Sequence, residues 1–219
     1  MSNIQGKHKA LCNNFSIMLL FIPVFLSGCG AHSAINRTEN YINAWPNITY
    51  TSNKNIVIGV IDKRPYIVNG NNKPSYIGLM RGGFNNPWYM NTESGKPLAD
   101  DLVEAAASGF KNAGINAEHV KLTFDMDQQT INNNLVLKKS YKKVLIKINE
   151  WQSDTYQNTV FLYDLTAEVY NEEGAMVAEG TEKNINENRE KQTVVSPIEA
   201  SRSALSKLLN NKEIMAALQ

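Results

Sequence analysis

Cysteine and histidine are scarce in this 219-residue chain, which contains two cysteines and three histidines. Both cysteines, Cys12 and Cys29, lie near the start, so the rest of the chain has no thiol for a disulfide, a nucleophile or a metal ligand. His119 is the one histidine beyond residue 32, and histidine-based zinc and iron sites usually combine several such ligands. We therefore expect neither a metal site nor a cofactor.

A strong charge of either sign is also missing. The 22 lysines and arginines nearly balance the 21 aspartates and glutamates, which gives a formal net charge of +1. Nucleic-acid binding normally needs a concentrated positive surface, because the affinity comes largely from neutralised phosphates. A nucleic-acid partner is therefore not expected.

The sequence has no hydrophobic run long enough to cross a bilayer, which takes about 20 apolar residues. The longest apolar run, Ile17–Leu26, is shorter than that and contains Pro23. Lys7 and Lys9 precede it. A short basic segment followed by a short apolar core is the layout of a signal peptide, which we place at residues 1–28.

The apolar run ends in Leu26-Ser27-Gly28-Cys29. This motif resembles the cleavage and acylation signal of bacterial lipoproteins. The resemblance implies cleavage before Cys29, diacylglycerol on its thiol and a third acyl chain on the new amine, which together hold a protein stably on a membrane. In these proteins Asp at the next position retains the chain in the inner membrane, so Gly30 implies the periplasmic face of the outer membrane. The alternative is an ordinary secretory signal with a chance cysteine.

Residues 29–55 are expected to form an acylated tether, because they are rich in Asn, Ser and Thr and show no sustained period. Tyr41, Ile42 and Trp45-Pro46 are exceptions and are candidates for docking on the domain. We expect a single domain at residues 56–219, which is close to the usual domain size.

The first half of this domain predicts a strand, a helix and a second strand. The continuous β-branched run Ile56–Ile61 is typical of a strand buried on both faces. Residues 97–113 begin with proline, carry acids in the first turn and place apolar residues at helical spacing, which predicts a helix. Residues 117–124 alternate as a strand. A strand–helix–strand unit of this length predicts a parallel pair joined by a right-handed crossover.

The second half predicts mainly strands. Residues 125–140 indicate a short, weak helix, and residues 143–151 a strand. Residues 159–171 and 175–185 alternate on either side of a turn and predict a long C-terminal β-hairpin. Ser196-Pro197-Ile198-Glu199 is a capping box that opens a final helix.

The predicted order is therefore β-α-β-(α)-β-β-β-α. We expect an α+β fold with a mixed sheet and helices packed on it.

Residues 66–96 form a long connection rich in glycine, asparagine and aromatic residues, in which residues 75–80 are the best candidate for a strand. Aromatic residues and arginine among adaptable Gly and Asn are typical of binding surfaces. We therefore mark Tyr76, Arg81, Phe84 and Trp88 as a possible partner-binding surface. The alternative is that Phe84 and Trp88 simply cover one end of the sheet.

Catalytic residues are not expected. The paired carboxylates have structural explanations as helix starts, caps or turns, and no serine has a base placed beside it by a known motif. A rival hypothesis is an envelope hydrolase that uses Asp100, Asp101 or His119. A third is a carrier of a small ligand or lipid, with a cavity between sheet and helices.

Four features together resemble small proteobacterial envelope lipoproteins of the YajG type. They are the motif at Cys29, the strand at residues 57–61 followed by Asp62 and Arg64, the helix entry at residues 92–99 and the later β-meander. This resemblance implies a non-enzymatic role in envelope assembly or maintenance, and no catalytic residues carry over. The leading hypothesis is a membrane-anchored lipoprotein that faces the periplasm and binds an envelope protein partner.

Overall fold

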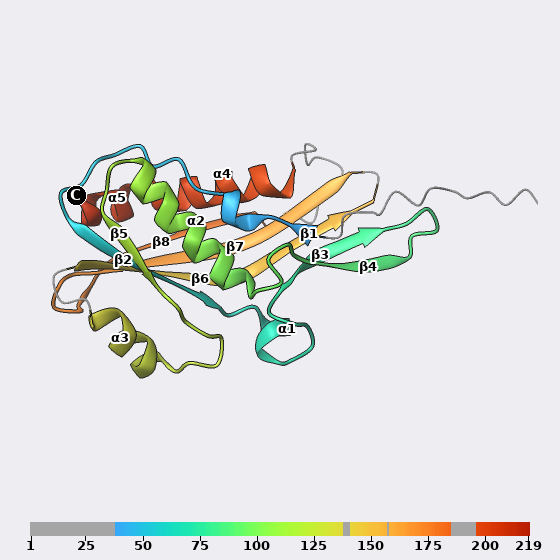
Figure 1. Ribbon diagram of the computed structural model, residues 1–219, viewed down its shortest axis with the longest axis horizontal. Helices are drawn as coiled ribbons and strands as arrows, with labels where there is room; N and C mark the ends of the chain where they lie inside the picture. The colour runs from blue at the N-terminus through green and yellow to red at the C-terminus, as the bar shows by residue number, and fades with distance from the viewer. Residues whose placement is uncertain (1–37, 138–140, 157, 185–195) are drawn as a thin grey trace, which may run out of the picture. The chain divides into compact units, whose positions relative to one another are not determined.

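The computed structural model describes residues 38–137, 141–156, 158–184 and 196–219 (Figure 1). The predicted signal peptide, Cys29 and Gly30 lie outside these ranges. Within them the chain forms helices packed on a mixed eight-stranded sheet, which confirms the predicted α+β fold. Among these described residues, no helix is both long enough and apolar enough to cross a membrane.

The sheet is organised around its longest strand. The strands are β1 (Thr38–Glu39), β2 (Asn55–Asp62), β3 (Tyr76–Arg81), β4 (Pro87–Thr92), β5 (Ala117–Val120), β6 (Tyr141–Thr155), β7 (Thr159–Tyr170) and β8 (Met176–Asn184). β6 pairs antiparallel with β7 along one side, and β7 continues to β8. Its other side is shared, because β6 pairs in parallel first with β2 and then, from Ser153 onward, with β3.

The helices divide between the two faces of the sheet. They are α1 (Pro65–Val68), α2 (Leu98–Asn112), α3 (Gln128–Val136), α4 (Pro197–Leu209) and α5 (Lys212–Leu218), with a 3-10 turn η1 (Tyr41–Asn43). Side chains of α2, α4, α5 and η1 share one large apolar core, whereas α3 packs into a smaller core on the other face. Figure 1 shows α3 separated from α2 and α4 by the sheet strands.

Strand β2 lies inside the sheet as its sequence predicted. Ile56, Ile58 and Val60 enter the large core, and Val57 and Ile61 enter the smaller one. Successive side chains of a strand point to opposite faces, so a continuous apolar run is the pattern of a strand covered on both sides.

The remaining predicted elements are present with small differences. β2 and β5 pair in parallel, as the strand–helix–strand pattern predicted, although β5 ends at Val120 rather than residue 124. β7 and β8 form the predicted hairpin. The Ser196 hydroxyl accepts the backbone N–H of Glu199 at 3.2 Å, with Pro197 in the first turn of α4. Ser196 is therefore the N-cap of α4, at the place where the sequence motif predicted the helix to start.

Part of the predicted tether packs on the predicted domain. Tyr41 is fully buried, and its ring lies 5.5 Å from that of Trp151. We call residues 38–50 the N-terminal segment. The segment shows no periodic pattern of apolar residues, because it is not buried as one face of a regular helix or strand. It is buried through contacts with distant parts of the chain. Tyr41 and Pro46, two of the candidates for docking, do contact the domain.

Candidate functional site

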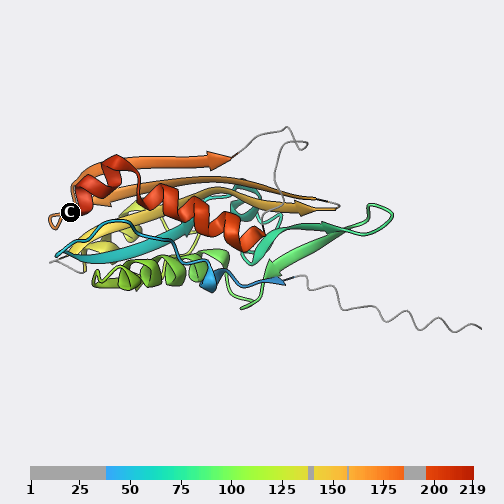
Figure 2. The ribbon, with the colours of Figure 1, turned by 90° about the horizontal axis from the view of Figure 1, so that it is seen from above.

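The four residues that the sequence indicates as a possible partner-binding surface lie on one β-hairpin, formed by β3 and β4. This hairpin extends past the ends of β6 and β7 (Figures 1 and 2). Its tip is closed by the backbone N–H of Gly82 bound to the carbonyl of Asn86 at 3.0 Å, and that of Asn85 bound to Gly82 at 2.7 Å. Asn85 takes a left-handed conformation with φ 61°, as a three-residue hairpin loop requires. Phe84 occupies the tip and is 94% exposed.

The hairpin is held on the sheet by one strand register and one ion pair. Gly78 lies opposite Ser153 of β6 in the parallel ladder. Arg81 makes a two-pronged contact with Asp154 through Nε at 2.7 Å and Nη2 at 2.8 Å. A bidentate pair of this kind fixes direction as well as distance, so the hairpin projects at a defined angle.

A fully buried arginine fixes the base of the hairpin. Arg64 binds both carboxylate oxygens of Asp62, at 2.9 and 2.6 Å. It also donates to the carbonyls of Tyr76 at 2.7 Å and Trp151 at 3.2 Å. Burial disfavours the charge, but the Asp62 carboxylate outweighs it and raises the pKa of Arg64 above its ordinary value. The guanidinium thus ties β2, β3 and β6 together.

Three tyrosines line one side of the hairpin base, and we call them the tyrosine face. The rings of Tyr66 and Tyr76 meet edge to face at 5.7 Å, and those of Tyr76 and Tyr89 at 5.6 Å. The Tyr66 hydroxyl donates to Glu150 at 2.6 Å. Burial raises the pKa of Tyr76 to about 12. Tyr76 is buried, whereas Tyr89 is 65% exposed, so the face presents one accessible ring on a fixed base.

A hollow of ≈ 380 Å³ lies beside this face. It is lined by Gly70, Asn71, Asn72, Lys73, Tyr76, Tyr89 and Asn91. Its walls therefore combine aromatic rings with amide groups and one ammonium group, and contain no carboxylate. Small-molecule and peptide sites commonly pair an apolar surface with a few polar groups in this way.

The four marked residues share the hairpin but differ in exposure. Tyr76 is buried at its base, Arg81 is paired with Asp154, and Phe84 stands in solvent. Trp88 is partly buried and packs against Gly82, where a Cβ would come within 2.6 Å of its ring. Trp88 thus covers neighbouring structure, and Phe84 does not.

Sequence reasoning passed over Tyr89 and Tyr66. The sequence contained a signal for Tyr89. In a strand, successive side chains point to opposite faces, so if Trp88 covers one face, Tyr89 is presented on the other. The sequence offered none for Tyr66, which reaches the face only through the fold.

Both aspartates of the hydrolase hypothesis have polar partners. Asp101 is fully buried, and the Ser94 hydroxyl lies 2.8 and 2.9 Å from its two oxygens. Burial raises the pKa of Asp101 to about 6. Asp100 pairs with Lys121 at 2.8 Å, and His119 is exposed on β5. Within the described ranges, no three His, Cys, Asp or Glu side chains are grouped as metal ligands would be.

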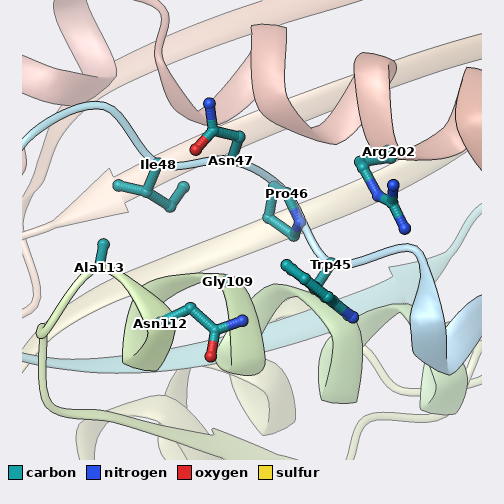
Figure 3. Close-up of a pocket in the computed structure, with 8 residues that line it drawn as sticks. All are labelled: Trp45, Pro46, Asn47, Ile48, Gly109, Asn112, Ala113 and Arg202. Atoms are coloured by element: carbon teal, nitrogen blue, oxygen red, sulfur yellow. The ribbon is translucent and has the colours of Figure 1, made fainter.

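A second, smaller hollow of ≈ 130 Å³ lies where the N-terminal segment crosses α2 and α4 (Figure 3). It is lined by Trp45, Pro46, Asn47, Ile48, Gly109, Asn112, Ala113 and Arg202. Arg202 lies over the Trp45 ring at 5.2 Å and donates to the carbonyl of Asn43 at 3.1 Å. Gly109 lets the segment approach closely, since a Cβ there would lie 2.5 Å from Pro46. These contacts fasten the entry of the chain to the domain.

No protein-family model and no curated protein matches the chain. Two solved structures are similar at 14% sequence identity. Protein XCC0632 from Xanthomonas campestris, described under the family DUF330, gives a TM-score of 0.43 over 80% of this chain and 88% of that one. A PelC dodecamer from Paraburkholderia phytofirmans gives a TM-score of 0.37 over 75% of this chain and 91% of that one. Likenesses this distant assign neither a family nor a function.

Proposed function

We propose that the chain is a lipid-anchored, non-enzymatic binding module that faces the periplasm from the outer membrane and docks an envelope protein partner. The anchor rests on the motif that ends at Cys29. The binding role rests on one structural observation, the braced β3–β4 hairpin with its tyrosine face.

The bracing favours recognition because a fixed surface loses little freedom on binding. Arg64 and Arg81 hold the hairpin through buried or bidentate contacts, and Tyr76 supports the ring of Tyr89 from below. Ordering mobile side chains commonly costs about 0.5–1.5 kcal/mol each on association. A ring already held in place avoids most of that cost, and exposed tyrosine is enriched at interface centres.

The neighbouring hollow gives the surface polar selectivity. Its amide groups and Lys73 can bind carbonyl or carboxylate oxygens of a partner, while the tyrosine rings take apolar side chains. A segment of a partner protein that carries an acidic or amide residue next to an apolar one fits this combination.

Site-specific photocrosslinking in intact envelopes tests the partner. A photoreactive residue at position 89 should give one discrete adduct. The matched control is Met176, which is 56% exposed on β8, away from the hairpin, and should give none. Equal labelling at both positions would count against the tyrosine face as a binding surface.

The anchor is tested separately. Mass spectrometry of the N-terminal peptide should find three acyl chains on Cys29, and Cys29→Ser should stop the protein from floating with outer-membrane vesicles. An unmodified cysteine in a processed chain would reject the anchored form of the proposal.

A further inference from the structure

We propose that the hairpin tip, led by Phe84, lies against the lipid bilayer that holds the anchor. The inference rests on the proposed function, because it takes Cys29 to be acylated. It assigns the tip to lipid, and leaves the tyrosine face at the hairpin base for the protein partner.

The composition of the tip suits a lipid surface. Phe84 is the most exposed large apolar side chain in the described part of the chain. Residues 82–87 carry no charged side chain, and the nearest charge, on Arg81, is committed to Asp154. An uncharged loop with a phenylalanine at its apex meets no cost of burying a charge at the boundary between headgroups and acyl chains, where membrane-surface segments bury Trp, Phe and Leu.

The direction of β1 relates Thr38 to the hairpin tip. β1 runs parallel to β4, with Thr38 opposite Asn91 and Glu39 opposite Thr92. β4 itself runs from the tip toward the base, since Pro87 follows the tip loop. The chain at Thr38 therefore travels away from the tip, so its N-terminal end points back toward the tip.

The reach of the chain agrees with this orientation. Thr38 lies level with Asn91, six residues along β4 from Asn85 at the tip, which is about 20 Å at 3.4 Å per residue. Cys29 precedes Thr38 by nine residues, which span at most about 30 Å. A membrane that lies at the acylated cysteine and in the direction of the tip is therefore at most about 10 Å beyond the tip when the connection is fully extended.

A second exposed aromatic residue lies at the same end of the sheet. β3 and β6 run in parallel, with Met80 opposite Thr155, so the turn after β6 lies beside the hairpin. Tyr156 begins that turn and is about half exposed. Figure 2 shows the end of β6, the start of β7 and the β3–β4 hairpin tip on the side opposite the C-terminus. Because the hairpin extends past the end of β6, Tyr156 is set back from Phe84, and a surface inclined toward β6 would contact both rings.

Fluorescence quenching in vesicles tests this placement. Phe84→Trp in the full acylated protein puts a reporter at the tip, and Met176→Trp puts a matched reporter at the opposite end. Both are reconstituted into vesicles of phosphatidylethanolamine and phosphatidylglycerol with brominated acyl chains. Wild-type spectra, with Trp45, Trp88 and Trp151, are subtracted.

The proposal expects the Phe84→Trp emission to shift to shorter wavelength and to lose intensity to the bromines, while the Met176→Trp emission changes in neither respect. If the protein floats with the vesicles but both reporters stay unquenched, the tip does not touch lipid and the inference is overturned, with the anchored function intact. The inference is also overturned if the Trp at position 84 is shielded from solvent in whole envelopes but not in pure lipid vesicles, since a protein rather than lipid would then cover the tip. Failure to float, with no acyl mass on Cys29, rejects the proposed function instead.

Discussion

Gly78→Ala should weaken the pairing of β3 with β6 and so detach the β3–β4 hairpin, which carries the candidate site, from the rest of the sheet. Gly78 has φ +149°, a conformation that side chains rarely adopt, and it lies opposite Ser153 in the β3–β6 ladder. A Cβ at this position would lie 2.2 Å from the Ser153 carbonyl oxygen and 2.6 Å from its amide nitrogen. Both are backbone atoms in the central strand, so neither can rotate away.

Two costs add to give the expected size of the effect. Holding a non-glycine residue in this region of backbone space costs about 1–3 kcal/mol. Forcing an extra carbon into a packed site costs typically about 1–3 kcal/mol more. We therefore expect a loss of about 2–6 kcal/mol in the free energy with which β3 is held on β6. Where the hairpin can detach alone, the loss will be local.

Urea unfolding followed by tryptophan emission measures the loss of global stability. Hydrogen exchange of the β3 and β4 amides measures the local detachment of the hairpin. Gly83→Ala is the matched control, because a Cβ there meets nothing within 4 Å. It should change stability by less than about 0.5 kcal/mol. If Gly78→Ala behaves like this control and β3 keeps its amide protection, the register between Gly78 and Ser153 is wrong, and the bracing argument with it.

Three further perturbations test other parts of the structure. Arg64→Met should cost about 3–5 kcal/mol in chemical unfolding because it strands the buried Asp62 carboxylate, and adding Asp62→Asn should recover much of that loss; no recovery would contradict the pairing. Burial raises the pKa of Asp101 from 3.8 to about 6, so the folded state binds this proton more tightly than the unfolded state does. The contribution of Asp101 to the free energy of unfolding is therefore complete below about pH 4 and falls as the pH rises to about 6. Asp101→Asn should flatten that part of a plot of Tm against pH, and an unchanged slope would rule out this residue as its source. Gly109→Ala should lower stability by about 1–3 kcal/mol by pushing Pro46 off α2, and an unchanged Tm would show that the segment packs differently.

Much of the fold follows from local sequence signals. The continuous apolar run of β2 predicted burial on both faces, and the capping box at Ser196 located the start of α4. Both signals depend only on neighbouring residues. The docking of residues 38–50 could not be read in the same way, because Tyr41 is buried against distant parts of the chain, including Trp151, more than a hundred positions away.

The hairpin shows why a site can be recognised in composition but not in geometry. Its strands are short. The strand candidate at residues 75–80 matches β3 to within one residue, whereas β4 and the register shift after Tyr76 were not predicted. Pro65 opens the single turn of α1, which was not predicted. Composition marked Phe84 and Trp88 alike, whereas the pairing of the strands decides that one is exposed and the other packs on Gly82.

The joining of the first and last parts of the domain has a consequence for the order in which it is assembled. Asn47 donates to Ser206 across 159 positions, and Asn210 donates back to the Asn47 carbonyl across 163. When the chain emerges N-terminus first, residues 38–50 therefore lack their α4 partners until nearly the whole chain has been released. Closing such long loops is slow compared with forming local turns. Residues 38–50 thus complete their packing last, when α4 has formed.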